Sequence, residues 1–238
     1  MRTFAHIPAF VEPVSITTVS SRIESKIFGS ISRAASTGID RVESVTIAPV
    51  DENKQPIMEK AEVIPCDTLL LSVGLIPENE LSRAAGVKLS DITKGAEVNQ
   101  FNQTEIPYIF ACGNVLHVND LVDHVSMESE IAGQAAADFA NGKLVNGSES
   151  ATVPGEGIRY VCPQRVDTAG GKDVTLYFRT LAPGRGTKLS VKVNGEELAA
   201  KKVICTSPGT MENLVIPKEK LAGINGDIVV TAVHDEAM

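Results

Sequence analysis

Two apolar runs that end at a glycine constrain the fold of this chain more than any other feature. The first, "CDTLLLSVG", ends at Gly74, and the second, "TEIPYIFACGN", runs from Thr104 to Asn114. A nearly continuous apolar run of this length is typical of a strand in a sheet that is covered on both faces. The sequence therefore predicts two buried strands and an α/β arrangement around them.

Helical signals follow both runs. Pro77 stands where a first helical turn would begin, "ENELSRAA" follows it, and Gly86 fits a C-terminal cap. After the second run, a loop leads into a predicted helix from about His124 to Asn141. This helix is rich in small side chains that let another backbone come close: Ala132, Gly133, Ala135, Ala136 and Ala137.

Strand-forming residues dominate both ends of the chain. The segments "VSITTVSSRIESKIFG", "DRVESVTIAPV" and "EKAEVIPCDTLLLSVG" predict an antiparallel meander, with "DENKQP" as a turn. Beyond about residue 145, "NGKLVNGSES" reads as a linker, and only strand and turn signals follow.

The last 85 or so residues alternate between apolar and polar positions, as expected for strands with one buried face. Val174, Leu176 and Phe178 share one face, and "GDIVVTAV" repeats the pattern. Asn194-Gly195 predicts a hairpin turn. These signals favour a small all-β sandwich of the immunoglobulin-like type, which would serve as a binding or packing module.

Charge and cysteine content exclude several classes of protein. The 22 Lys and Arg against 30 Asp and Glu give a net charge of −8 without any basic run, which disfavours nucleic acid and anionic membrane as partners. No apolar stretch reaches the roughly 18 residues of a membrane span, and the N-terminus lacks a signal-peptide pattern, so a cytoplasmic location is expected. The 4 cysteines lie far apart and predict reduced, mostly buried thiols rather than a metal site.

The glycine ends are the candidate ligand site. In doubly wound sheets, ligands sit at the carboxyl ends of strands, where a glycine lets a cofactor approach the backbone. Asn114, directly after Gly113, can hydrogen-bond a sugar-like hydroxyl chain. On this dipeptide alone, a simple turn that ends a core strand is the alternative.

The longer pattern, Thr104-x-x-Pro107-x-Ile109-Phe110-Ala111-Cys112-Gly113-Asn114, resembles the second flavin-binding motif of the pyridine nucleotide-disulfide oxidoreductase family. The run "CDTLLLSVGLIPENEL" is similar to the companion motif, where the chain returns from the NAD(P)-binding to the FAD-binding domain. From about residue 40 onward, the chain resembles bacterial NAD(P)/FAD-dependent oxidoreductases with a C-terminal β-domain.

The resemblance implies FAD and NAD(P)H as cofactors and assigns three segments: residues 1–65 as a remnant of the NAD(P)-binding domain, 66–145 as the C-terminal part of the FAD-binding domain, and 151–238 as the β-sandwich. Asn114 would bind a ribityl hydroxyl, and the helix after His124 would point its N-terminus at the flavin pyrimidine edge. His124 itself is either a proton donor or a solvent-facing or capping residue. The implied cofactor-binding residues are Gly74, Gly113, Asn114, Val115, Val125 and Ser126.

The sequence also departs from the family, because it contains neither G-x-G-x-x-G fingerprint nor a C-x-x-C redox pair. It therefore predicts the C-terminal portion of a flavoprotein, inactive alone, that passes hydride from NAD(P)H to FAD and on to an unknown acceptor. The expected partner is the missing N-terminal half or a flavoprotein subunit, with a homodimer as a further option. Two alternatives remain: a non-catalytic protein-binding module that uses the β-sandwich, and a structural protein with coincidental glycines.

Overall fold

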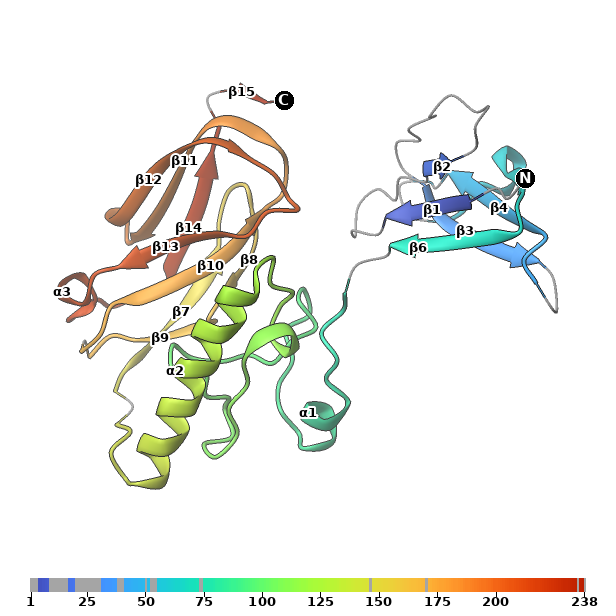
Figure 1. Ribbon diagram of the computed structural model, residues 1–238. Helices are drawn as coiled ribbons and strands as arrows, with labels where there is room; N and C mark the ends of the chain where they lie inside the picture. The colour runs from blue at the N-terminus through green and yellow to red at the C-terminus, as the bar shows by residue number, and fades with distance from the viewer. Residues whose placement is uncertain are drawn as a thin grey trace. The chain divides into compact units, whose positions relative to one another are not determined.

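The computed structural model has a mixed α/β fold with several sheets (Figure 1). It describes residues 4–8, 17–19, 31–37, 41–49, 51, 55–72, 75–145, 147–169, 171–234 and 236–237. The chain divides into two compact units, Met1–Leu75 and Ile76–Met238. The division predicted from the sequence, into residues 1–65, 66–145 and 151–238, stays a prediction.

The described residues of the first unit form two sheets. One has the strand order β2-β1-β6, in which β6 runs parallel and β2 antiparallel to β1. The other is antiparallel with the order β3-β4-β5, so the predicted antiparallel pairing of the second and third segments is confirmed by β4 and β5. The first segment of the predicted meander does not join them: its described residues form β2, which pairs with β1 in the other sheet, and β3 lies beyond that segment. The elements are β1 (Phe4–Pro8), β2 (Thr17–Val19), β3 (Ile31–Thr37), β4 (Ser44–Pro49), η1 (Met58–Lys60), β5 (Glu62–Pro65) and β6 (Thr68–Ser72). The first predicted apolar run therefore does form a strand, β6.

Residues 76–145 of the second unit contain two short helical elements and one long helix. They are α1 (Glu80–Ala84), the 3-10 turn η2 (Gly113–Val115) and α2 (Val122–Ala140). Helix α1 ends as predicted at Gly86, whose φ is 80°. The N–H groups of Gly86 and Val87 donate to the carbonyls of Arg83 and Ser82, which is a Schellman cap. The long predicted helix is also confirmed, although it begins at Val122.

The predicted strand from Thr104 to Asn114 is wrong. This segment forms only an isolated bridge, between Gln103 and Phe110, before η2 begins. The Thr104 N–H donates to the Ile109 carbonyl at 3.0 Å, so the segment opens with a local turn. A strand needs a neighbour for its ladder of hydrogen bonds, whereas this backbone satisfies its polar groups locally.

The remaining strands form two sheets that contribute to one apolar core. A 3-stranded sheet has the order β13-β10-β8, and a 6-stranded sheet has the order β12-β11-β14-β7-β9, with β15 also paired to β11. The elements are β7 (Glu149–Pro154), β8 (Ile158–Cys162), β9 (Arg165–Asp167), β10 (Val174–Thr180), β11 (Gly184–Val193), β12 (Glu196–Thr206), β13 (Glu212–Ile216), α3 (Lys218–Leu221), β14 (Ile228–Val233) and β15 (Glu236–Ala237).

The alternation predicted for β10 and β14 is confirmed, because Val174, Leu176 and Phe178 are all buried in this core. Asn194 and Gly195 both have positive φ and join β11 to β12, which confirms the hairpin. The more specific immunoglobulin-like topology stays a prediction.

A second, smaller core joins residues 76–145 to residues 147–237, which hold β7 to β15 and are called the β region below. Cys162 at the end of β8 packs in one cluster with Val87, Ala96, Val98, Ala111 and Leu116. The Gln164 N–H donates to the Val98 carbonyl at 3.0 Å. The β region is therefore packed directly against the segment that contains η2.

Candidate functional site

The centre of the candidate site is the buried residue Gly113, the first residue of η2. Its φ is +70°, a conformation that L side chains rarely adopt. A Cβ at this position would lie 3.0 Å from Val125 Cγ1 on α2. A side chain at position 113 would therefore be strained and would crowd Val125, another of the residues that the resemblance assigned to the site.

The other two residues of η2 point in different directions. Asn114 is exposed, and its Oδ1 accepts the Asn119 N–H at 3.1 Å, so the Nδ2 group is the part of the amide that this contact does not use. Val115 is half-buried, and its carbonyl accepts a hydrogen bond from Nδ2 of buried Asn79 at 2.8 Å. Asn114 can therefore offer a side-chain donor to a ligand, whereas Val115 anchors the turn to the interior.

The N-terminus of α2 follows η2 closely. Its N-cap residue is Leu121, whose side chain has no group that can accept a hydrogen bond. The N–H groups of the first turn of α2 therefore have no side-chain cap. Ser126 is exposed and donates its hydroxyl to the Val122 carbonyl at 3.1 Å. The predicted site residue Gly74 lies outside the described residues.

Sequence reasoning missed the group that holds this turn, a buried network around Glu128. The Gly113 N–H donates to Glu128 Oε2 at 2.7 Å, and His117 Nε2 lies 2.7 Å from Glu128 Oε1. Asn119 Nδ2 adds longer contacts of 3.4 and 3.5 Å to the same carboxylate. His117 and Glu128 are 1% and 4% exposed. The sequence does contain one signal for this role: the Glu128 carboxylate lies one helical turn before Ala132, on the face of α2 that carries small residues.

Aromatic side chains from the β region cover the histidines. The His117 ring lies 5.9 Å from Tyr160 and 6.1 Å from Tyr177, and the His124 ring lies 5.6 Å from Tyr177, measured between centroids. His124 is half-buried against β10 rather than facing solvent. Burial raises the pKa of Tyr160 to about 12 and also raises the pKa values of Tyr177 and the Cys162 thiol.

An ion pair between the buried Arg179 and the partly exposed Asp120 holds the loop between η2 and α2. Arg179 of β10, whose side chain is 3% exposed, contacts Asp120 at 2.5 Å and donates to the Val118 carbonyl at 2.9 Å. The second oxygen of Asp120 accepts the Met211 N–H at 2.6 Å. The β region therefore contributes directly to the shape of the candidate site.

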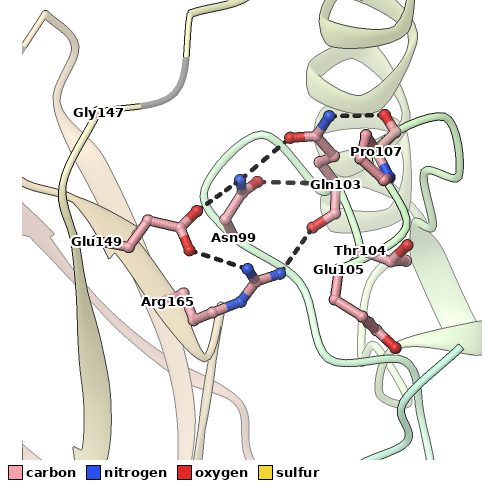
Figure 2. A pocket seen from close by; sticks show the side chains of 8 residues that line it. All are labelled: Asn99, Gln103, Thr104, Glu105, Pro107, Gly147, Glu149 and Arg165. Atoms are coloured by element: carbon pink, nitrogen blue, oxygen red, sulfur yellow. Dashed lines mark hydrogen bonds and ion pairs between the residues drawn. The ribbon is translucent and has the colours of Figure 1, made fainter.

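A separate pocket of about 330 Å³ lies where the Thr104 turn meets β7 and β9. Figure 2 shows that its polar groups are largely bonded to one another. Arg165 donates to Glu149 at 2.9 Å, and Asn99 donates to Glu149 at 3.0 Å and to Gln103 at 3.4 Å (Figure 2). We interpret this network as a structural connection, because none of the sequence-predicted site residues lines it.

The four cysteines are free thiols, of which Cys66 and Cys162 are buried, Cys112 is half-buried and Cys205 is exposed. The expectation that most would be buried therefore holds for two of them. Among the residues that the structure describes, no helix is long and apolar enough to span a membrane.

Comparison with known proteins adds three findings. Residues 22–138 match the family model of the pyridine nucleotide-disulphide oxidoreductases. Hydrogen cyanide synthase subunit HcnB of Pseudomonas aeruginosa is 32% identical over 81 residues, which cover 33% of this chain and 18% of that protein. HcnB of Pseudomonas protegens is also 32% identical over 81 residues, with coverages of 33% and 17%. The chain thus matches less than a fifth of the length of these curated relatives.

A solved structure is also similar, the ferredoxin reductase for the CYP199A2 system from Rhodopseudomonas palustris. The alignment covers 81% of this chain and 42% of that chain, with a TM-score of 0.36 and 18% sequence identity.

Proposed function

Because this chain belongs, through residues 22–138, to the pyridine nucleotide-disulphide oxidoreductase family, we propose that it is the C-terminal portion of a flavoprotein oxidoreductase. The observation that carries the proposal is the turn at Gly113, where the family's motif residues meet the first turns of α2. Gly113 has a positive φ and no space for a side chain beside Val125. The turn therefore has the conformation for which the motif needs a glycine, and it is followed directly by the exposed side chain of Asn114.

In the proposed site, Asn114 binds the ribityl chain of FAD. Its Oδ1 is already occupied by the Asn119 N–H, so the Nδ2 group is the end that donates to a ribityl hydroxyl. Gly113, whose own N–H is bonded to Glu128, shapes the turn that carries Asn114, and Val125 and Ser126 lie near the start of the helix that follows. FAD, when bound, supplies the hydride-accepting group that links NAD(P)H to an acceptor.

The start of α2 suits the electron-rich pyrimidine edge of a flavin. First-turn N–H groups and the helix dipole favour negative charge there. Asp123 lies in the same turn, where its own negative charge also interacts favourably with the helix dipole.

We further propose that the chain works with a second polypeptide segment and is inactive alone. The sequence contains no G-x-G-x-x-G fingerprint for either dinucleotide, so the pyrophosphate contacts must come from an N-terminal half or from a flavoprotein subunit. HcnB, a relative over 81 residues, is by name a subunit of hydrogen cyanide synthase, which supports a partner subunit here.

The test is FAD affinity, measured by flavin fluorescence during titration of the purified protein. Asn114→Leu should weaken FAD binding on the order of fivefold, because a ribityl hydroxyl loses its donor. Gln134→Leu, an exposed polar position on α2, is the matched control and should leave the affinity unchanged. Without the pyrophosphate contacts the wild-type chain should bind FAD weakly through the turn and the start of α2. Equal affinity in wild type and Asn114→Leu, or no FAD binding by the wild type at high flavin concentration, would contradict the contacts proposed for this chain.

A further inference from the structure

The buried carboxylate of Glu128 has no role in the proposed contacts with FAD. It lies on α2, yet its strongest interactions reach outside the helix, to the Gly113 N–H and to His117, both at 2.7 Å. A buried charge is costly unless several donors compensate it. Here the donors are a backbone N–H, an imidazole and the Asn119 amide, so the carboxylate is well compensated.

The contacts of Glu128 converge on both sides of Asn114. The residue before it, Gly113, donates its N–H to Oε2, and Asn119, whose N–H fixes Asn114 Oδ1, contacts both carboxylate oxygens. The backbone carbonyl of Glu128 is also used, by Asn102 Nδ2 at 2.9 Å. A single residue therefore connects α2 to the two points that orient the Asn114 side chain.

His117 is oriented by the same carboxylate. Its Nε2 is the atom that faces Glu128, so Nε2 carries the hydrogen in this network. Its Nδ1 is buried without a hydrogen-bond partner among the described residues, which indicates that the Glu128 contact, together with the packing of Tyr160 and Tyr177, holds the ring.

We infer that Glu128 is a positioning residue that sets the conformation of the Gly113-Asn114 turn and thereby the direction of the Asn114 amide. The inference deepens the proposed function and rests on it for the identity of the ligand. Glu128 does not touch the cofactor; it acts through Gly113 and Asn119.

The first test needs no cofactor. A short hydrogen bond to a carboxylate shifts an amide proton strongly downfield, so the Gly113 resonance in the full chain reports the contact. Glu128→Gln keeps the shape but removes the charge, and it should move this resonance upfield. Glu130→Gln, an exposed position on the same helix, is the control. A Gly113 resonance that moves no more in Glu128→Gln than in the control would overturn the inference.

The second test is a double-mutant cycle on FAD affinity with Glu128→Gln and Asn114→Leu. Glu128→Gln should weaken FAD binding by up to about fivefold, the loss expected for Asn114→Leu. If it acts through the turn, the double variant should bind little more weakly than the weaker single variant. Additive losses would mean a general structural role and would overturn the inference. An Asn114→Leu variant with wild-type affinity would instead contradict the proposed function, and the Gly113 resonance would still decide the role of Glu128 in the turn.

Discussion

Two regions of the larger compact unit hold their backbones in different ways. Residues 147–237 use ladders between strands and a large apolar cluster that includes Leu176, Phe178 and Leu189. Residues 76–145 have few regular elements, and polar side chains such as Asn79, Asn102 and Glu128 bond directly to the backbone. In the second arrangement one polar side chain fixes a turn that no ladder supports. Such a turn can keep its outer face open to a ligand.

The largest expected effect comes from the apolar core of the β region. Phe178→Ala removes a fully buried ring and should lower the free energy of unfolding by about 3–5 kcal/mol. Because η2 and the β strands belong to the same compact unit, Ile76–Met238, they should unfold together. Tyrosine fluorescence and the Gly113 resonance should therefore report the same transition in denaturant. Separate midpoints for these two probes would contradict this expectation, since the two regions would then unfold independently.

Alkaline pH tests the contact between the regions. Below pH 10.0, Tyr160 carries its proton in both the folded and the unfolded state, so its contribution is fully present. Between pH 10.0 and its folded pKa of about 12, only the unfolded state ionises, and the free energy of unfolding falls by up to about 3 kcal/mol. The raised pKa of the Cys162 thiol adds a loss that begins near its ordinary value of 9.0.

The measurement is denaturant unfolding at a series of pH values. Tyr160→Phe should reduce the decline above pH 10.0 and leave the part that comes from Tyr177 and Cys162, whereas Tyr108→Phe, at an exposed tyrosine, should not change the decline. A decline of the same size in Tyr160→Phe would contradict the assignment.

Removal of the Asp120 carboxylate should produce a smaller loss. In Asp120→Ala, the buried guanidinium of Arg179 loses its ion pair with this carboxylate and the Met211 N–H loses its acceptor. We expect the free energy of unfolding to fall by about 2 kcal/mol. Asp123→Ala, three residues on and exposed at the start of α2, should cost less than about 1 kcal/mol. Equal losses would show that the ion pair does not hold the loop.

The smallest effects come from two glycines. Gly113→Ala must adopt a positive φ beside Val125 and should lower the free energy of unfolding by about 1–2 kcal/mol. Gly133→Ala, within α2 and with nothing within 4 Å, should instead raise it by up to about 1 kcal/mol. Thermal denaturation of the two variants should therefore shift the midpoint in opposite directions.

The same difference between the regions explains which features could be predicted from the sequence. Alternation placed Val174, Leu176 and Phe178 on one buried face, and Asn194-Gly195 marked a hairpin, because these signals are local. The run from Thr104 to Asn114 read as a strand because its apolar residues are indeed needed for packing. Whether a strand forms depends on a neighbour, which a local pattern does not contain.

The candidate site was predicted in part for a similar reason. Gly113 and Val125 belong to a motif and a helix start, and the structure places them in contact. Glu128 and His117 lie 11 residues apart and meet only because η2 and the following loop turn back onto α2. Their pairing depends on tertiary structure, so no spacing rule for a helix or a strand would have connected them.

The most direct test of the central claim is an amide NMR titration of the ¹⁵N-labelled chain with FAD. The account predicts that the largest shift changes fall on the turn at Gly113 and Asn114 and on the first turns of α2, including Val125 and Ser126. Shift changes centred instead on Glu149 and Arg165 in the separate pocket, or none at all, would contradict the claim that this turn binds a flavin.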